Sequence, residues 1–179
     1  MRGRLRLGTA IAATVTVFTA SLAYAAAGRL DAPAQVHQPA LRLSPPDNQR
    51  LTPEQRAAYD MVAIVNLERA ERGLPAYVWH DQVGDAAYEH SADMAIHRSL
   101  QHAGRDGSNA GLRLTRAGFV WTTWGENIGA GFSEPQPLFT AWFNSPSHRP
   151  QLLGDYRYIG VGAVASSDGT PYWTLVVAS

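Results

Sequence analysis

Residues 158–178 read YIGVGAVASSDGTPYWTLVVA, and this stretch decides the fold class. Two runs rich in β-branched and aromatic residues, Tyr158 to Ala165 and Tyr172 to Ala178, stand on either side of Asp168-Gly169. An Asp-Gly pair between two such runs is a strong signal for a β-hairpin. The C-terminal part of the chain is therefore predicted to form two antiparallel strands.

Helices and one further strand are predicted before this hairpin. Thr52-Pro53-Glu54-Gln55 combines a capping threonine, a proline and a glutamine at the positions that begin a helix, and Gly73 ends that helix near Arg72. The other predicted elements are a helix from Asp81 to Arg98, a loop from Ser99 to Ser108, a helix from Ala110 to Ala117, a strand that follows Phe119 and is broken by Gly129 and Gly131, a helix that begins at the capping box Ser133-Glu134-Pro135-Gln136, and a short helix that begins at Ser145-Pro146. This order indicates an α+β sheet covered by helices rather than a doubly wound repeat.

The composition excludes several classes of protein. The chain has 179 residues, 15 basic and 15 acidic side chains, and neither Cys nor Lys. The absence of Cys excludes a thiol nucleophile, a Cys-ligated zinc and a disulfide framework, and the absence of Lys excludes Schiff-base chemistry. A net charge of +0 argues against a general nucleic-acid binder. No common nucleotide-binding, nucleophile-elbow or metalloprotease motif is present.

The first 50 residues are predicted to be an export signal followed by a linker. Arg2, Arg4 and Arg6 precede an uncharged stretch from Leu7 to Ala27 that ends in small residues of the A-x-A type. This pattern predicts a signal peptide over residues 1–27, with an uncleaved membrane anchor as the alternative because the stretch is long enough to span a bilayer. Residues 28–50 contain four prolines and are predicted to be a linker, and residues 51–179 are predicted to be one folded domain.

Three separate clusters carry the side chains that could perform chemistry. His102 stands in a predicted loop, as a functional imidazole or as an ordinary exposed residue. Glu126 is wedged between Trp124 and an apolar strand, so it either faces a polar cavity or accepts structural hydrogen bonds. With Ser145 as an N-cap, His148 falls in the first helical turn, where the dipole favours the neutral imidazole that binds a metal or accepts a proton. The alternative for His148 is that it only packs or caps.

Other polar residues are given structural roles. Asn127 is predicted to hydrogen-bond to neighbouring backbone rather than to contact a ligand. His90, Asp93 and His97 share a helix face at metal-ligand spacing, but His90 lies on the apolar side and is predicted to be a hydrogen-bonded core residue. No His–acid pair is indicated by spacing at the serines that could serve as nucleophiles, which are Ser91, Ser145 and Ser147.

Together these stretches resemble the CAP superfamily, which groups the cysteine-rich secretory proteins, antigen 5 and pathogenesis-related 1. The resemblance covers about Tyr59 to Val177 and is to the short bacterial secreted branch, which lacks disulfides. The matching stretches are Val65-Asn66-Leu67-Glu68-Arg69 with Gly73-Leu74, Ala87 to Met94, His102, Gly125-Glu126-Asn127-Ile128, Trp142 to Arg149, and Ile159-Gly160-Val161-Gly162.

The resemblance implies a three-layer α-β-α sandwich with a central cavity lined by two His and two Glu, of which the His pair can bind a divalent metal, often zinc. His102 and His148 match the two His, and Glu126 matches the first Glu. Ser145 stands where the family has its second Glu, which removes a candidate general base. His102, His148 and Glu126 are thus the implied metal ligands, with an open coordination position, and Trp124, Asn127 and Ser145 are supporting residues of the cavity.

Three classes of function are compatible with this resemblance. The first is an exported, non-catalytic module that binds a lipid, another hydrophobic ligand or an extracellular partner protein, with no nucleic acid involved and with membrane contact only through an uncleaved leader. Phe119, Trp121, Trp124 and Phe132 are candidate groove aromatics, whose alternative is ordinary packing. The second is a metal-assisted hydrolase of peptides or cell-envelope material, with Glu126 as ligand or general base. A wall-associated adhesion module tethered by residues 28–50 is a third class.

Overall fold

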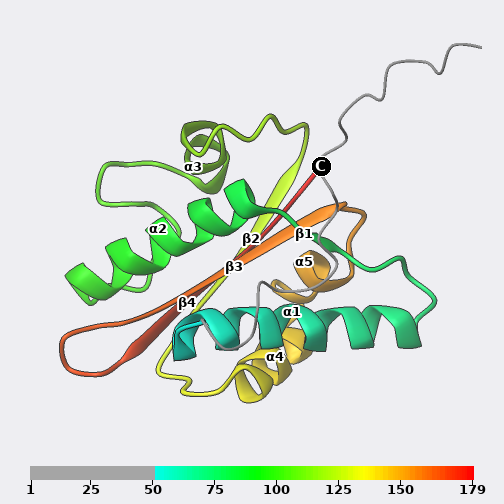
Figure 1. Ribbon diagram of the computed structural model, residues 1–179, viewed down its shortest axis with the longest axis horizontal. Helices are drawn as coiled ribbons and strands as arrows, with labels where there is room; N and C mark the ends of the chain where they lie inside the picture. Colours follow the sequence, from blue (N-terminus) through cyan, green and yellow to red (C-terminus); the bar gives the residue numbers. More distant parts are fainter. Residues whose placement is uncertain (1–50) are drawn as a thin grey trace, which may run out of the picture. The chain divides into compact units, whose positions relative to one another are not determined.

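The computed structural model describes residues 51–179, which form a mixed α+β domain (Figure 1). Along the chain the elements are α1 (Pro53–Glu71), β1 (Val78–Trp79), α2 (Asp81–His97), α3 (Ala110–Arg116), β2 (Trp124–Ala130), α4 (Pro135–Asn144), α5 (Arg149–Leu153), β3 (Tyr158–Ala165) and β4 (Pro171–Ala178). The sheet order is β1-β3-β4-β2. Strands β3 and β4 form the predicted hairpin, β2 pairs antiparallel with β4, and β1 pairs parallel with β3.

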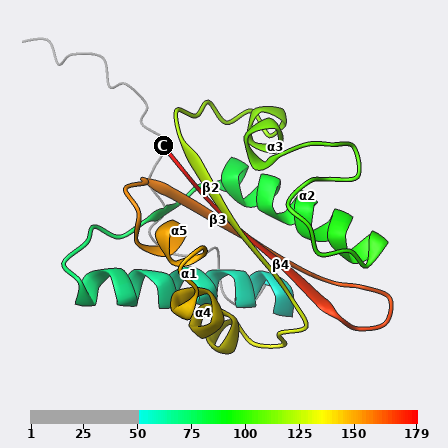
Figure 2. The same ribbon diagram turned by 180° about the vertical axis from the view of Figure 1, so that it is seen from behind.

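The sheet separates two layers of helices, which both views show edge-on (Figures 1 and 2). One face packs against α1, α4 and α5 through a core that includes Met61, Trp142, Leu152 and Leu175. The other face packs against α2 and α3 through smaller groups of buried residues. Side chains on a strand alternate between faces, and β4 follows this rule, because Trp173, Leu175 and Val177 belong to the first core. The three-layer α-β-α sandwich is therefore confirmed.

Two glycines of β3 bring α2 unusually close to the sheet. A Cβ atom placed on Gly160 would lie 2.2 Å from the backbone nitrogen of Gly84, and one on Gly162 would lie 2.5 Å from the backbone of Tyr88. No other residue fits this contact, because real Cβ atoms do not approach backbone atoms to this distance. The backbone of α2, the helix that precedes His102, is therefore packed directly against the backbone of β3.

A buried arginine joins α1 to the end of α5. Arg69 donates to the carbonyl oxygens of Leu152 and Gly154 at 3.1 and 3.0 Å, and its guanidinium lies 3.5 Å from the centre of the Tyr77 ring. Carbonyl groups at the end of a helix lack hydrogen-bond donors within the helix, and Arg69 supplies these donors. It thereby fixes the short helix that follows His148.

The helix starts were predicted with mixed success. The capping box of Thr52 and Gln55 is confirmed, with both hydrogen bonds present. The predicted start at Ser145-Pro146 is wrong, because α5 begins at Arg149 and Ser145 instead ends α4. The predicted box at Ser133 is also wrong, because Glu134 is the N-cap of α4 and makes no capping bond. A serine before a proline marks a turn as readily as a helix start, and here it marks the turn.

The strands also differ from the prediction in two places. Gly129 does not break β2, which continues to Ala130, because Leu138 and Trp142 pack against the space that a side chain would fill at Gly129. Strand β1 is only two residues long and was not predicted. The predicted signal peptide (1–27) and linker (28–50) lie outside the described residues. Within residues 51–179, no helix combines the length and apolar character needed to cross a bilayer.

Candidate functional site

A pocket of about 540 Å³ opens at the N-terminal half of β2. Its walls come from both helical layers, since the loop after α2 and the start of α3 form one wall and the α4–α5 connection forms the other. The lining residues are His102, Ala103, Gly107, Ser108, Asn109, Ala110, Trp124, Gly125, Glu126, Ser147, His148 and Gln151. The volume lies within the range of pockets that bind small molecules or short segments.

Glu126 forms the centre of an ion-pair network at this pocket. Both of its carboxylate oxygens are engaged, since His102 Nδ1 lies 2.9 Å from Oε1 and Arg113 Nη2 donates to Oε2 at 2.5 Å. The side chains of Glu126 and Arg113 are only 4% exposed, whereas that of His102 is 60% exposed. A buried carboxylate needs such partners, because an isolated charge in the interior is strongly unfavourable.

Arg113 is the member of this network that the sequence analysis missed. It lies on α3, is buried, and also donates to the carbonyl oxygen of Ser108 at 2.9 Å. An arginine in a short helix has no spacing that pairs it with a glutamate in a later strand. The available signal was its place next to Leu114 on the buried side of α3, where a charge requires a partner.

His102 and His148 have opposite electrostatic environments. The hydrogen bond to Glu126 raises the pKa of His102 above its ordinary value. Burial, followed by the charge of His102, lowers the pKa of His148. At neutral pH, His148 is therefore the imidazole that more readily stays neutral.

His148 is held by two serines at the end of α4. Its Nδ1 atom lies 2.7 Å from the Ser145 hydroxyl and 3.2 Å from the Ser147 hydroxyl. His148 is the N-cap residue of α5 rather than a member of its first turn, which corrects the predicted position. Asn127 reaches across from β2 and donates to the carbonyl oxygen of His148 at 2.9 Å. Asn127 thus bonds to backbone, but the predicted partner in the neighbouring backbone is wrong, because the carbonyl oxygen belongs to a residue 21 positions away.

The donor set at the pocket offers two imidazoles for a metal. Within residues 51–179, no three His, Asp or Glu side chains gather as a metal-holding group. Glu126 orients His102 through Nδ1, the arrangement in which a carboxylate supports a liganding imidazole from behind. The Nε2 atoms of His102 and His148 make no hydrogen bond in this part of the chain and are the groups that could hold a metal.

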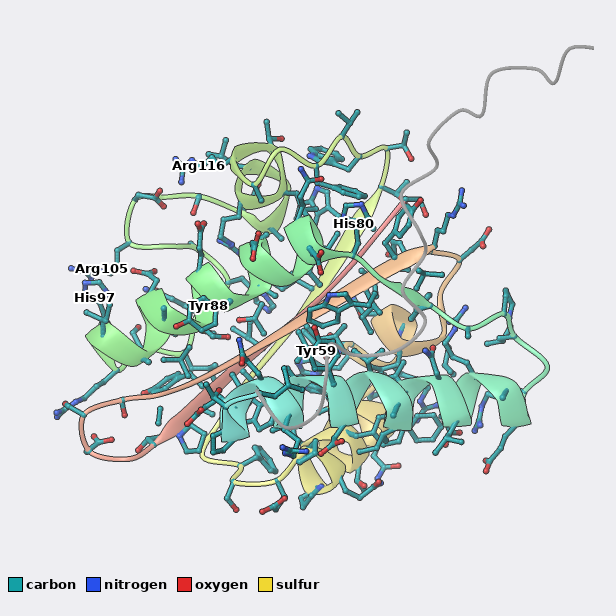
Figure 3. All side chains as sticks on the ribbon, in the orientation of Figure 1. Tyr59, His80, Tyr88, His97, Arg105 and Arg116 are labelled. Atoms are coloured by element: carbon teal, nitrogen blue, oxygen red, sulfur yellow. The ribbon has the colours of Figure 1, made fainter. Side chains whose placement is uncertain are left out.

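The second histidine cluster does not form a site. His90 is buried, and its Nε2 atom lies 3.0 Å from the carbonyl oxygen of Gln101, so its predicted core role is confirmed. His97 pairs with Asp93 on the exposed side of α2 at 3.0 Å. Figure 3 shows His97 at the C-terminal end of that helix.

The predicted groove aromatics have mostly structural positions. Of the four, only Trp124 lines the pocket. Phe119 belongs to the core beneath α2, and Phe132 packs against the opposite core. Trp121 is partly exposed, donates to the Gly111 carbonyl oxygen at 3.0 Å and contacts Trp124 edge-on. Ser91, one of the serines considered as a nucleophile, is buried and donates to the carbonyl oxygen of Gly162 in β3.

Comparison with known proteins gives a consistent result. The sequence model of the cysteine-rich secretory protein family (CAP) matches residues 62–177. The Bacillus subtilis protein YkwD is 30% identical over 125 residues, which are 68% of this chain and 48% of YkwD. A Bacillus anthracis structure described as an extracellular protein containing a SCP domain is 29% identical, with a TM-score of 0.64 over 75% of this chain and 45% of that one. This chain thus spans about half the length of both relatives.

A third comparison concerns the fold alone. The structure of an outer surface protein from Borrelia burgdorferi has a TM-score of 0.66 and 19% identity. The match covers 72% of this chain and 96% of that protein.

Proposed function

This chain belongs to the cysteine-rich secretory protein (CAP) family, and from that premise we propose that it is an extracellular binding module whose ligand occupies the pocket between His102 and His148. The location is supported by the B. anthracis relative, which is described as extracellular, and by the export pattern of residues 1–27. We assign residues 28–50 as the linker and residues 51–179 as the binding domain.

One observation carries the choice of binding over catalysis. Both oxygens of Glu126 are already held, by His102 and by the buried Arg113. A general base needs a free lone pair directed at the attacking water, and an ion-paired carboxylate is poorly placed to supply one. Ser145 stands in place of a second acid, and among the described residues that line the pocket Glu126 is the one with a carboxylate.

The ligand is a lipid or other hydrophobic molecule, or a segment of an extracellular protein. Trp124 and Ala103 supply apolar surface to the pocket, while Ser147 and His148 supply polar groups. Such a mixture is typical of sites that bury a ligand and fix its orientation with a few hydrogen bonds.

A divalent metal is a separate part of the proposal. Zinc would be held by the Nε2 atoms of His102 and His148, and its chemistry when bound would be to order a polar group of the ligand. Two imidazoles make a weak site, and protonation of His102 competes with metal binding. Calorimetry with zinc should show binding to the parent protein and to His97→Ala, but not to His102→Ala/His148→Ala. Equal binding by all three would dismiss the site.

The binding proposal is tested by filling the pocket. Ser147→Trp places a bulky group on the pocket wall, and Ser133→Trp is the matched control at an exposed serine outside the pocket. The full chain purified from its own host is examined by native mass spectrometry, in which the parent and Ser133→Trp should carry the same bound mass and Ser147→Trp should lose it. If Ser147→Trp carried the same bound mass as the parent, the ligand would not be bound in this pocket.

Turnover assays test the alternative with casein and with cell-envelope material as substrates. The binding proposal expects no turnover that depends on Glu126. Turnover that Glu126→Gln abolishes in a folded protein would replace the proposal with the hydrolase.

A further inference from the structure

The outer edge of β2 carries backbone groups that the sheet does not use. Within residues 51–179, strand β2 pairs only with β4, so its other side is an edge of the sheet. In an antiparallel pair, alternate residues direct their N–H and C=O groups to the partner strand and the others direct them away. Thr123 exchanges bonds with Ser179, and the Gly131 N–H donates to Pro171, so odd-numbered residues face inward. Trp124, Glu126 and Ile128 therefore direct their backbone groups outward.

The two halves of this edge are treated differently by the fold. At the C-terminal half, the Trp142 indole donates to the carbonyl oxygen of Ile128 at 3.0 Å and covers the edge. At the N-terminal half, the outward N–H and C=O groups of Trp124 and Glu126 form no hydrogen bond within the described residues. An uncovered edge is a template for another strand, and most proteins blunt or cover it.

These free groups lie at the pocket. Trp124, Gly125 and Glu126 line it, with His102 from the α2–α3 side and His148 from the α4–α5 side. Figure 2 shows α3 and α5 on opposite sides of the sheet. Because the two walls of the pocket come from these two layers, the pocket straddles the edge of β2. A ligand in it would lie in the plane of the sheet, beside the strand.

We propose that the pocket takes an extended segment of another extracellular polypeptide, which adds to β2 as a further strand. This deepens the proposed function and depends on it. The outward N–H and C=O groups of Trp124 and Glu126 are two donors and two acceptors. Because the two residues are two positions apart in an extended strand, their spacing matches that of the backbone groups of another extended chain. An acyl chain offers no hydrogen-bonding groups and would leave all four without a partner.

The proposed partner is a separate chain, and the residues that precede the domain are the alternative occupant. Residues 28–50 contain Pro33, Pro39, Pro45 and Pro46. Proline has no N–H to donate and is disfavoured where a strand must pair. A segment that pairs with Trp124 and Glu126 needs a free N–H on two residues separated by one, which residues 28–50 provide only in proline-free runs of five residues or fewer. Amide hydrogen exchange in the free chain distinguishes the two occupants.

The register also predicts where the side chains of the segment lie. Directly opposed residues in an antiparallel pair place their side chains on the same face. Peptide residues opposite Trp124 and Glu126 therefore face the wall of His102, and the residue between them, opposite Gly125, faces the wall of Ser147 and His148.

The experiment uses the full chain and a positional-scanning library of capped heptapeptides. The tightest binder is resynthesised with one backbone N-methyl group at each position in turn. Methylation of the two residues that donate to β2 should weaken binding about tenfold each, whereas methylation of the residue between them should change it about twofold or less. Ser147→Trp should lose binding and Ser133→Trp should keep it.

Amide hydrogen exchange provides the second readout. The N–H groups of Trp124 and Glu126 should exchange rapidly in the free protein and become protected when the peptide is bound. Protection already present in the free chain would show that its own residues cover the edge, and would overturn the proposal.

Two further results would also overturn the proposal. One is the absence of any heptapeptide that binds at about 1 mM, and the other is binding that is insensitive to the position of the N-methyl group. A non-peptide mass lost from Ser147→Trp would leave the proposed binding function intact while this inference fails.

Discussion

Replacing Arg113 with methionine should destabilise the domain far more than the loss of an ordinary surface charge. The change removes the donors to Glu126 Oε2 at 2.5 Å and to the Ser108 carbonyl oxygen at 2.9 Å, in a place where both charged side chains are 4% exposed. Breaking a buried pair by removing one partner costs about 3–5 kcal/mol. His102 still holds Oε1 of Glu126, which places the expected loss near the lower end, at about 3 kcal/mol.

Urea unfolding of the full chain at pH 7 measures this loss. With a slope of about 1.5 kcal/mol per molar, a loss of about 3 kcal/mol lowers the urea midpoint by about 2 M. The matched control is Arg116→Met on the same helix, because Arg116 pairs with Asp106 where both side chains are about half exposed. That pair is screened by water, and its removal should move the midpoint little.

A double-mutant cycle separates the ion pair from the loss of packing. Arg113→Met/Glu126→Met replaces both charges with apolar groups of similar length, and such replacements of a buried pair are often neutral or stabilising. We therefore expect the double variant to recover most of the stability that each single variant loses. Losses that add, or an Arg113→Met midpoint equal to that of Arg116→Met, would refute the assignment of a buried ion pair.

Three further predictions concern single residues. Thr52→Ala removes the capping box of α1 and should lower the unfolding free energy by about 1 kcal/mol, measured by urea unfolding. Burial lowers the pKa of His90, so the folded state resists its protonation and loses stability as the pH falls below about 6.5. His90→Gln should make the unfolding free energy depend less on pH in this range, and an unchanged slope of unfolding free energy against pH would contradict this. The raised pKa of His102 stabilises the folded state. This contribution is fully present below about pH 6.5 and is lost as the pH rises through the pKa of His102 in the folded state. An NMR titration in EDTA should show that Glu126→Gln brings this pKa down.

The sequence predicted those parts of the fold that depend on local patterns. The hairpin around Asp168-Gly169 and the helix that begins at Thr52 follow from turn and capping chemistry, and both are present. Strand β1 could not be predicted, because two residues carry no periodicity. The start of α5 could not be placed, because Ser-Pro is compatible with both a turn and a helix.

The candidate site divides in the same way. The sequence singled out His102, Glu126 and His148, and the structure places all three at one pocket. Arg113 escaped notice, because the partner of a buried charge is fixed by how α3 packs on the sheet and not by any spacing along the chain. The free edge of β2 was equally hidden, since which backbone groups are left over depends on the register with β4.

The two imidazoles of the pocket are positioned by helical layers on opposite faces of the sheet. His102 follows α2, which Gly160 and Gly162 hold against the sheet, and His148 precedes α5, which Arg69 anchors to α1. The pocket at the edge of β2 lies between them. Any displacement of one helical layer relative to the other would therefore change the distance between His102 and His148, and with it the width of the pocket.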